Sequence, residues 1–177
     1  MAGLAANVDF VNVMTYDAAG AWSPATGANA GMSLINAAIA GYRAAGLPAH
    51  QLQIGIPLYA RAFAGVKFSG NKAQIVTGGL PFNKAVAAPG TVEPSVVDYN
   101  DLAANYLPTY SKGYDTVENS LTVWNEQKGI WISAEDATTA KIKANLAVTH
   151  GLAGVFVWEP SQETTNTVIR AIKVALN

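Results

Sequence analysis

Aromatic and charged residues follow three apolar stretches of this chain, and their side chains could bind a ligand by hydrogen bonding and stacking. The stretches cover residues 8–14, 52–58 and 154–157, and each contains valine or isoleucine. Open α/β sheets and barrels bind their ligands beyond the carboxyl ends of such strands. We therefore expect a site where the three strands end. The residues at these ends are Tyr16 and Asp17, Tyr59 and Arg61, and Trp158 and Glu159.

Each of these residues also has a purely structural interpretation. A Tyr-Asp pair after an apolar strand often forms a turn in which the hydroxyl is satisfied locally. Trp158 could be a core residue, and Arg61 could pair with any surface carboxylate. The same arrangement recurs at three strand ends, and this recurrence favours a site.

The elements that would position these residues predict a parallel α/β arrangement. Residues 34–45 carry apolar side chains at helical spacing, and Gly46 and Pro48 form a stop signal. Strand, helix and strand then form a β-α-β unit, which implies a right-handed crossover and parallel strands. Strands of this kind are normally buried on both faces. An incomplete barrel should therefore expose an apolar patch on its inner face. The strand residues concerned are Val11, Val13, Ile54, Ile56, Val155 and Val157.

Two further helices are expected near the carboxyl end. Asp136 is a suitable N-cap for a helix that ends near His150. Ser161 can cap the last helix, whose apolar stripe runs from Val168 to Leu176. These helices would flank the third strand and cover one face of the sheet.

Residues 62–130 interrupt the α/β pattern with a small α+β region. Glycine and proline separate short apolar pieces there. Residues 121–125 and 130–133 alternate in polarity and predict two antiparallel strands. Trp124 and Trp131 lie in these strands, and we expect them to pack inside the region.

Composition excludes several classes of protein. The chain has 177 residues and a net charge of −1, which argues against nucleic acid or anionic membranes as partners. It contains no cysteine, and His50 and His150 have no partner at metal-ligand spacing, so we expect no metal and no cofactor. No apolar run approaches the roughly 20 residues of a membrane span. A complete (β/α)₈ barrel needs about 200–250 residues, so the chain is too short for eight units.

Three motifs carry a resemblance to a known family. They are Asn12-x-Met14-x-Tyr16-Asp17, Gly55–Arg61 (GIPLYAR) and Gly151–Glu159 (GLAGVFVWE). In this order they resemble the last three barrel strands of family 18 glycoside hydrolases, the chitinases and their relatives. The resemblance implies an α/β fold, namely a partial (β/α)₈ TIM barrel of three βα units with a small α+β insertion. The implied division is a barrel segment of residues 1–61 and 131–177 and an insertion of residues 62–130.

The resemblance also implies a reaction and a role for the first motif. Retaining cleavage of N-acetylglucosamine polymers can use the acetamide oxygen of the substrate as the nucleophile. The enzyme then supplies an acid, donors that orient the acetamide, and an aromatic floor. By resemblance, Tyr16 would hold the acetamide carbonyl, and Asp17 would hydrogen-bond to sugar hydroxyls or to the acid.

The remaining site residues would bind substrate. By the same resemblance, Met14 would line the subsite of Tyr16, and Trp158 would lie under the cleaved sugar. Tyr59 and Arg61 would contact neighbouring sugars. Trp22, the only large residue of the loop 18–30, would be an outer platform.

The proton donor of the family has no counterpart in this chain. The catalytic signature of the family is Asp-x-x-Asp-x-Asp-x-Glu, and the closest local match starts at Asp98 and Asp101. Ala103 and Asn105 occupy the next two positions of the signature, and helix capping explains Asp98 better. Glu159 also follows the last strand, but it does not match the acid of the family.

These observations leave three hypotheses open. The first is a segment of a chitinase that hydrolyses β-1,4-linked N-acetylglucosamine, inactive alone because the acid is absent. The second is a non-catalytic module that binds chitin or N-acetylglucosamine oligosaccharides. The third is a small α/β domain with neither property. We also expect self-association or pairing with a missing barrel half, and by resemblance an extracellular location, although the first six residues lack the basic leader of a signal peptide.

Overall fold

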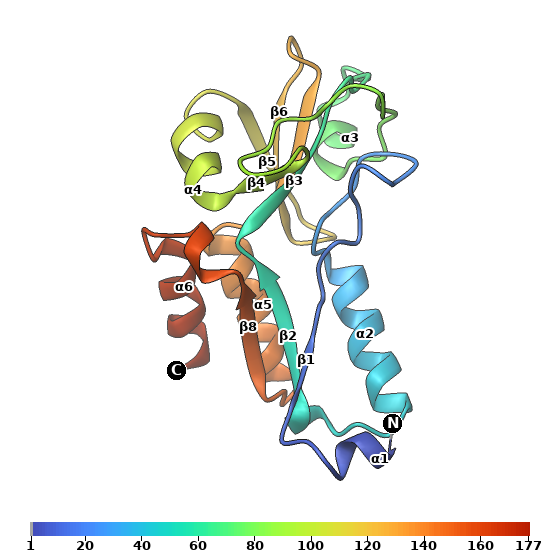
Figure 1. Cartoon of the computed structure of the whole chain (residues 1–177), viewed down its shortest axis with the longest axis vertical. Coiled ribbons are helices and arrows are strands. Elements are labelled where there is room, and N and C mark those ends of the chain that lie inside the picture. Colours follow the sequence, from blue (N-terminus) through green and yellow to red (C-terminus); the bar gives the residue numbers. More distant parts are fainter. Residues whose placement is uncertain (1) are drawn as a thin grey trace.

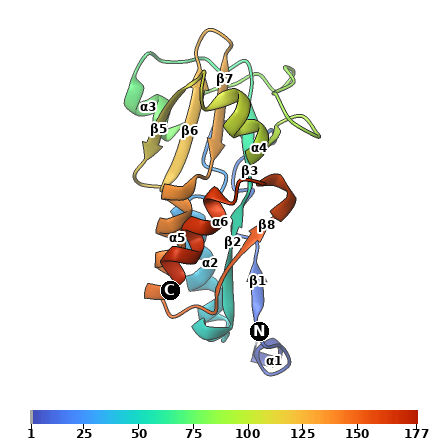
Figure 2. The ribbon, with the colours of Figure 1, turned by 90° about the vertical axis from the view of Figure 1, so that its left-hand side faces the viewer.

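The computed structural model describes residues 2–177, which form two sheets stacked end to end with helices around them (Figure 1). The first sheet has three strands in the order β1-β2-β8, and the second has five strands in the order β4-β3-β7-β6-β5. Figure 2 shows β2 and β8 running toward the five-stranded sheet. The chain therefore brings the ends of the parallel strands to the boundary between the two sheets.

The three-stranded sheet contains the three predicted parallel strands. Pairing runs in parallel through the row Val13, Ile54 and Val155. The first strand is shorter than predicted because its pairing starts only at Val11, opposite Leu52. The strands are β1 (Val11–Val13), β2 (Leu52–Pro57) and β8 (Gly154–Trp158).

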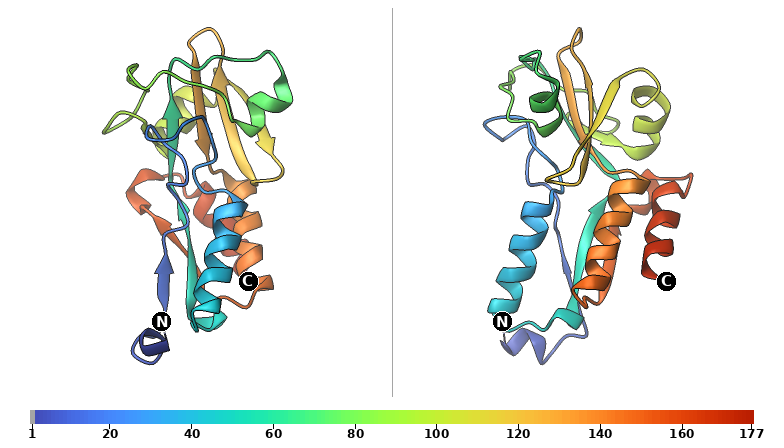
Figure 3. Two further views of the ribbon diagram at one scale, coloured as in Figure 1. Left: turned by 90° about the vertical axis from the view of Figure 1, so that its right-hand side faces the viewer. Right: turned by 180° about the vertical axis from the view of Figure 1, so that it is seen from behind.

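Three helices cover one face of this sheet, as Figure 3 shows from two sides. Ile54 packs in one cluster with Ile35 and Ile39. Ile56 packs in another cluster with Ala144 and Ile172. Burial of these apolar stripes explains why the predicted helices form and where they dock. The helices are α2 (Met32–Ala44), α5 (Ala137–Thr149) and α6 (Thr167–Leu176).

The other face of the sheet is open, and its composition differs from our expectation. Side chains alternate between the faces of a strand, and the register places all six predicted valines and isoleucines on the face that the helices cover. These six residues therefore do not contribute to the apolar patch that we expected on the inner face. The open face carries other apolar side chains together with polar ones, and three of its apolar residues are more than half exposed. These are Phe10 (51%), Met14 (71%) and Trp158 (55%).

The helix ends agree with the sequence at one position and differ at two. Asp136 caps α5, because its Oδ1 accepts the N–H groups of Thr138 at 2.9 Å and Thr139 at 3.0 Å. Ser161 does not cap α6. Pro160–Gln162 forms a separate short 3₁₀ turn there, and Glu163 Oε1 accepts the N–H of Thr167 at 2.9 Å instead.

Asp98 is the second difference. It precedes α4 (Tyr99–Asp101), but its side chain makes no cap hydrogen bond. The Nε2 group of Gln162 donates to Asp98 Oδ1 at 2.9 Å instead. The chain continues from α4 as a π-helical turn over Leu102–Tyr106.

The five-stranded sheet is antiparallel throughout and larger than predicted. The chain enters it at Leu58, whose N–H donates to the Trp158 carbonyl at 2.7 Å and whose carbonyl accepts from the Tyr99 N–H at 3.0 Å. This sheet therefore starts before residue 62 and includes residues beyond 131, on either side of the expected insertion. Its strands are β3 (Tyr59–Phe63), β4 (Val96–Asp98), β5 (Ser111–Asp115), β6 (Ser120–Asn125) and β7 (Ile130–Ala134).

Both faces of the five-stranded sheet are covered. On one face Trp124 and Trp131 pack with Phe63, and Trp131 Nε1 donates to the Ile75 carbonyl of α3 (Lys72–Thr77) at 2.6 Å. On the other face, the cluster that contains Leu102 buries the alternate residues of the same strands. The predicted packing role of the two tryptophans is confirmed. Among the described residues, no helix is both long and apolar enough to cross a membrane.

Candidate functional site

A cleft of about 360 Å³ lies where the three parallel strands end below β3 and β4. Six of the seven predicted site residues line it, and Trp22 does not. Glu93, Val96 and Gln162 also line it, although sequence analysis did not select them. The predicted residues in the cleft are Met14, Tyr16, Asp17, Tyr59, Arg61 and Trp158.

The Asp17 carboxylate is the centre of the polar contacts in this cleft. Its Oδ1 accepts the hydroxyl of Tyr59 at 2.6 Å and the guanidinium of Arg61 at 2.9 Å (Nε) and 2.7 Å (Nη2). Asp17 lies four residues beyond the end of β1, and Tyr59 and Arg61 come from β3, so the contacts join the two sheets. Among residues 2–177, no side chain donates a hydrogen bond to Asp17 Oδ2, which leaves this oxygen available to a ligand.

The backbone before Asp17 is fixed by contacts with β2. Thr15 Oγ1 accepts the N–H of Gly55 and donates to its carbonyl, both at 2.9 Å. Gly55 also lets the Tyr16 ring approach, because a Cβ there would lie 2.5 Å from Tyr16 Cε1 and 2.8 Å from Phe156 Cζ. A side chain at residue 55 would therefore displace Tyr16 from the cleft.

The two tyrosines of the cleft are neutral hydrogen-bond donors. Burial raises the pKa of Tyr16, and the charge of Asp17 adds to this shift. Burial also raises the pKa of Tyr59, with the hydrogen bond and charge of Asp17 adding to it and Arg61 opposing it. The rings meet edge to face with 6.1 Å between centroids. At neutral pH both phenols therefore keep their protons, as donation to a carbonyl or carboxylate requires.

Trp22 lies outside the cleft lining but contacts one of its members. The Arg61 guanidinium carbon lies 4.9 Å from the centroid of the Trp22 ring, within the range of a cation–π contact. Gly20 gives the indole room, because a Cβ there would lie 2.5 Å from it. Trp22 is 56% exposed, so one side of its ring remains open beside Arg61.

The residues that sequence analysis missed come from loops. Glu93 lies between α3 and β4, in a stretch punctuated by proline and glycine, and no local pattern indicates that it reaches the cleft. Gln162 follows β8 closely, and its side chain joins Asp98 to the Glu159 N–H at 2.9 and 3.0 Å. Its position after a predicted site strand was the one signal that could have identified it.

The acidic residues that were weighed as possible proton donors have structural partners. Asp101 accepts from Thr91 Oγ1 at 2.9 Å and from Asn105 Nδ2 at 2.7 Å. Glu159 accepts from the Ser161 hydroxyl and does not line the cleft. The carboxylates in the cleft are those of Asp17 and Glu93. Among the described residues, no group of three or more His, Cys, Asp or Glu side chains could hold a metal ion.

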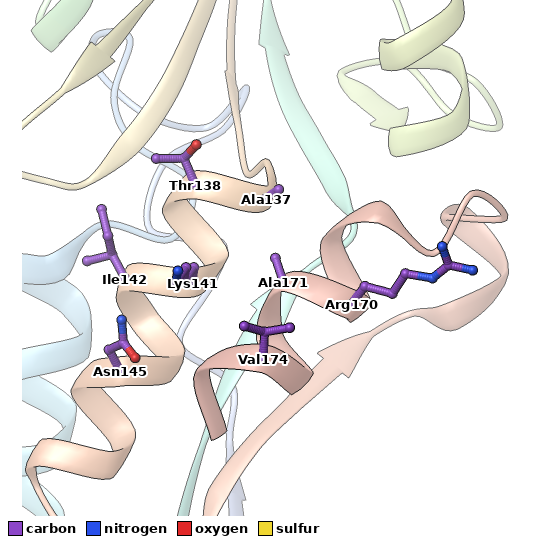
Figure 4. A pocket seen from close by; sticks show the side chains of 8 residues that line it. All are labelled: Ala137, Thr138, Lys141, Ile142, Asn145, Arg170, Ala171 and Val174. Carbon is purple, nitrogen blue, oxygen red and sulfur yellow. The ribbon is translucent and has the colours of Figure 1, made fainter. Parts of the chain in front are cut away.

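A larger hollow of about 580 Å³ lies between α5 and α6, and none of the predicted site residues lines it (Figure 4). Its lining is mainly apolar and includes Ile142 and Val174. Lys141 and Arg170 are its two charged residues, and Figure 4 shows the Arg170 side chain extending away from Lys141. The cations therefore do not converge on a common point, and the cleft is the better candidate for a site.

Comparison with known proteins decides the family. The model of glycosyl hydrolases family 18 matches residues 1–163. The chain belongs to this family. Chitinase A1 of Niallia circulans is 31% identical to this family 18 chain over 195 residues, which cover 99% of the chain and 27% of the relative.

Solved family 18 structures extend the likeness to the fold. A chitinase from Rhizomucor miehei matches with a TM-score of 0.88 at 21% identity, covering 100% of this chain and 56% of that one. A chitinase from Cycas revoluta in complex with (GlcNAc)₃ matches with a TM-score of 0.83 at 24% identity, covering 98% and 48%. The family 18 chain therefore shares the fold of the matched part of these two chitinases and spans about half of their length.

Proposed function

We propose that the cleft binds N-acetylglucosamine oligosaccharides and that the chain alone does not hydrolyse them. The observation that carries this proposal is the Asp17 carboxylate, held by Tyr59 and Arg61 beside Tyr16 and Trp158. Family 18 membership and the oligosaccharide complex of the Cycas revoluta chitinase support the choice of sugar.

Each group in the cleft has a chemical role in this proposal. The neutral Tyr16 hydroxyl donates to the acetamide carbonyl, and Asp17 Oδ2 accepts from the acetamide N–H or a sugar hydroxyl. Trp158, 55% exposed, stacks against the apolar face of a pyranose. Met14 borders the same sugar, while Tyr59 and Arg61 hold Asp17 in place and contact the neighbouring unit. Trp22 extends the aromatic surface on the far side of Arg61.

The absence of the family's catalytic signature, which supplies the proton donor, limits the proposed chemistry to binding. A positioned general acid contributes about 10²–10⁴-fold in rate. Neither Asp98 nor Asp101 lines the cleft, and their carboxylates accept hydrogen bonds from neighbouring side chains. We therefore propose that the chain corresponds to the last three βα units of a family 18 barrel, with an α+β insertion between the second and third. An extracellular location stays a prediction from the family.

A non-catalytic binding module is the alternative function. Polar contacts around Asp17 form without any further protein segment, and this observation favours such a module. The two candidates differ in what the missing portion of the barrel would add. Supplying that portion as a separate chain would restore hydrolysis for an enzyme segment and leave a binding module inactive.

Titration with chitotriose tests the proposed function. We expect a dissociation constant on the order of 1 mM, or about 4 kcal/mol, by NMR, because the cleft is open on one side. Binding should weaken in Trp158→Ala and Tyr16→Phe. No chemical-shift change at several millimolar sugar, or equal affinity in Trp158→Ala, would contradict the proposed site.

A fluorogenic chitobiose glycoside tests the absence of hydrolysis. We expect no release of the fluorophore above the rate of the buffer. Release that scales with protein and is lost in Tyr16→Phe would require another acid. Glu93 would then be the first residue to replace, because it lines the cleft while Glu159 does not.

A further inference from the structure

Asn29 is a buried residue that lies outside the cleft and yet contacts the backbone of two cleft residues. It is 1% exposed and sits at the end of the loop that follows Asp17. Its side-chain Oδ1 accepts the N–H of Asp17 at 2.9 Å, and its Nδ2 donates to the Tyr59 carbonyl at 3.3 Å. One donor and one acceptor face the amide, which fixes the assignment of its oxygen and nitrogen.

The backbone of Asn29 makes two further contacts. Its carbonyl accepts the N–H of Ala18 at 2.9 Å, and its N–H donates to Ser133 Oγ at 2.8 Å. Ser133 pairs directly with Arg61 across β7 and β3. Asn29 thereby links the end of β1, the start of β3 and the strand partner of Arg61.

The backbone conformation of Asp17 is one that the hydrogen bonds to Asn29 can stabilise. Asp17 has a φ of 62°, in the left-handed region that residues other than glycine rarely adopt. The consecutive N–H groups of Asp17 and Ala18 both donate to Asn29, the first to its side chain and the second to its carbonyl. A buried residue whose side-chain oxygen and nitrogen are both hydrogen-bonded can hold a turn that local preference alone would not maintain.

We propose that Asn29 is the positioning residue of the cleft. It fixes the left-handed turn at Asp17 relative to Tyr59 and Arg61, so the carboxylate receives both donors on one oxygen and presents the other to the sugar. Asn29 does not touch the ligand in this arrangement. Its effect on binding rests on the proposed function, while its effect on the geometry of Asp17 does not.

The first test uses the unmodified chain. The Asp17 amide lies outside the strands, and its hydrogen-bond acceptor is the Asn29 side chain. We expect NMR hydrogen exchange at this amide to be slow, as for the paired strands. Exchange at the rate of an unprotected amide would overturn the proposal, and this measurement needs no variant that could fail to fold.

The second test compares Asn29→Ala with Thr26→Val. Thr26 lies in the same loop, is 4% exposed, and accepts the Leu80 N–H on Oγ1 at 3.0 Å, so its replacement also removes a buried hydrogen bond. The chain contains three arginines, which makes the Nε–H resonance of Arg61 assignable. In Asn29→Ala this resonance should move toward those of Arg43 and Arg170. Thr26→Val should leave it unchanged.

Chitotriose affinity completes the comparison. We expect the dissociation constant to rise about tenfold in Asn29→Ala and to stay within about twofold in Thr26→Val. Equal changes in both variants, or an unchanged Arg61 resonance in Asn29→Ala, would overturn the positioning role. If the unmodified chain binds no chitotriose, the proposed function fails, while amide exchange and the Arg61 resonance still decide the role of Asn29.

Discussion

The two sheets of this chain differ in how completely they are covered. The five-stranded sheet buries residues on both faces, with Trp124 and Trp131 on one face and Leu121 and Val123 on the other. The three-stranded sheet has helices on one face and exposed side chains on the other, including Met14.

This difference explains where a ligand can bind. The five-stranded sheet, covered on both faces, can hold side chains rigidly. The three-stranded sheet, covered on one face, leaves a surface that a ligand can reach. The cleft lies at their boundary and takes Asp17 from one sheet and Arg61 from the other. The five-stranded sheet thus holds the cleft residues rigidly, and the uncovered face of the three-stranded sheet gives a ligand access to them.

The largest effect on stability is expected at the covered faces. Trp131 is 1% exposed, and Trp131→Ala would leave a cavity and an unpaired carbonyl at Ile75. We expect a loss of about 3–5 kcal/mol in the free energy of unfolding by urea denaturation. Trp22→Ala is the matched control and should cost less than about 1 kcal/mol. Equal losses would mean that the burial of Trp131 in the five-stranded sheet adds no stability beyond that of an exposed tryptophan.

A buried ion pair ties α5 to the end of β7. The Lys143 ammonium contacts Glu135, and their side chains are 0% and 2% exposed. Lys143→Met would leave the buried carboxylate without its cation and should cost about 3–5 kcal/mol. The exposed neighbour Lys141→Met is the control and should change little. A similar stability for both variants would show that the pair does not hold the helix to the sheet.

The cost of Lys143→Met should depend on pH. Burial raises the pKa of Glu135, and Lys143 opposes this rise. Without Lys143 the folded pKa rises further above the unfolded value of about 4.3. The folded chain then keeps a proton that the unfolded chain releases, so stability is full below the unfolded pKa and falls as pH increases. Urea denaturation should therefore find a larger loss at about pH 8 than at about pH 4.

The open face should promote self-association. Phe10 is 51% exposed beside the unpaired edge of β1. Burying a phenylalanine side chain in an interface would contribute about 1.5–3 kcal/mol to the free energy of association. We expect light scattering to increase with protein concentration and Phe10→Lys to weaken association at least tenfold. Val117→Lys, at a 73% exposed position of the five-stranded region, is the control. A compact monomer at all concentrations would mean that the open face needs no cover.

The smallest effect is expected for chitotriose affinity when the Arg61–Asp17 contact at the boundary between the two sheets is weakened. Arg61 donates two hydrogen bonds to Asp17 Oδ1, and its side chain is 13% exposed. Arg61→Lys keeps the charge but removes the planar fork, which should cost about 0.5–1 kcal/mol of chitotriose affinity, or a few-fold in dissociation constant. Isothermal titration can measure this change. An unchanged affinity would indicate that charge alone orients Asp17.

The sequence by itself determined the local elements and the family. Periodicity and stop signals predicted the parallel strands and their helices, and alternation predicted two antiparallel strands and the packing of Trp124 and Trp131. Three motifs at strand ends selected six residues that the structure gathers in one cleft. These features could be predicted because spacing, capping and strand ends depend on neighbouring residues, which a sequence displays directly.

Only the tertiary structure decided the partners of individual side chains. The register turned Val13 and Ile54 toward the helices, although the apolar run gave no sign of which face each would take. Folding brought Glu93 into the cleft and placed Asn29 against Tyr59, 30 residues away. Asp98 bonds to Gln162, 64 residues away, instead of capping its own helix. Such contacts depend on how distant segments pack, and short-range sequence patterns carry no information about that packing.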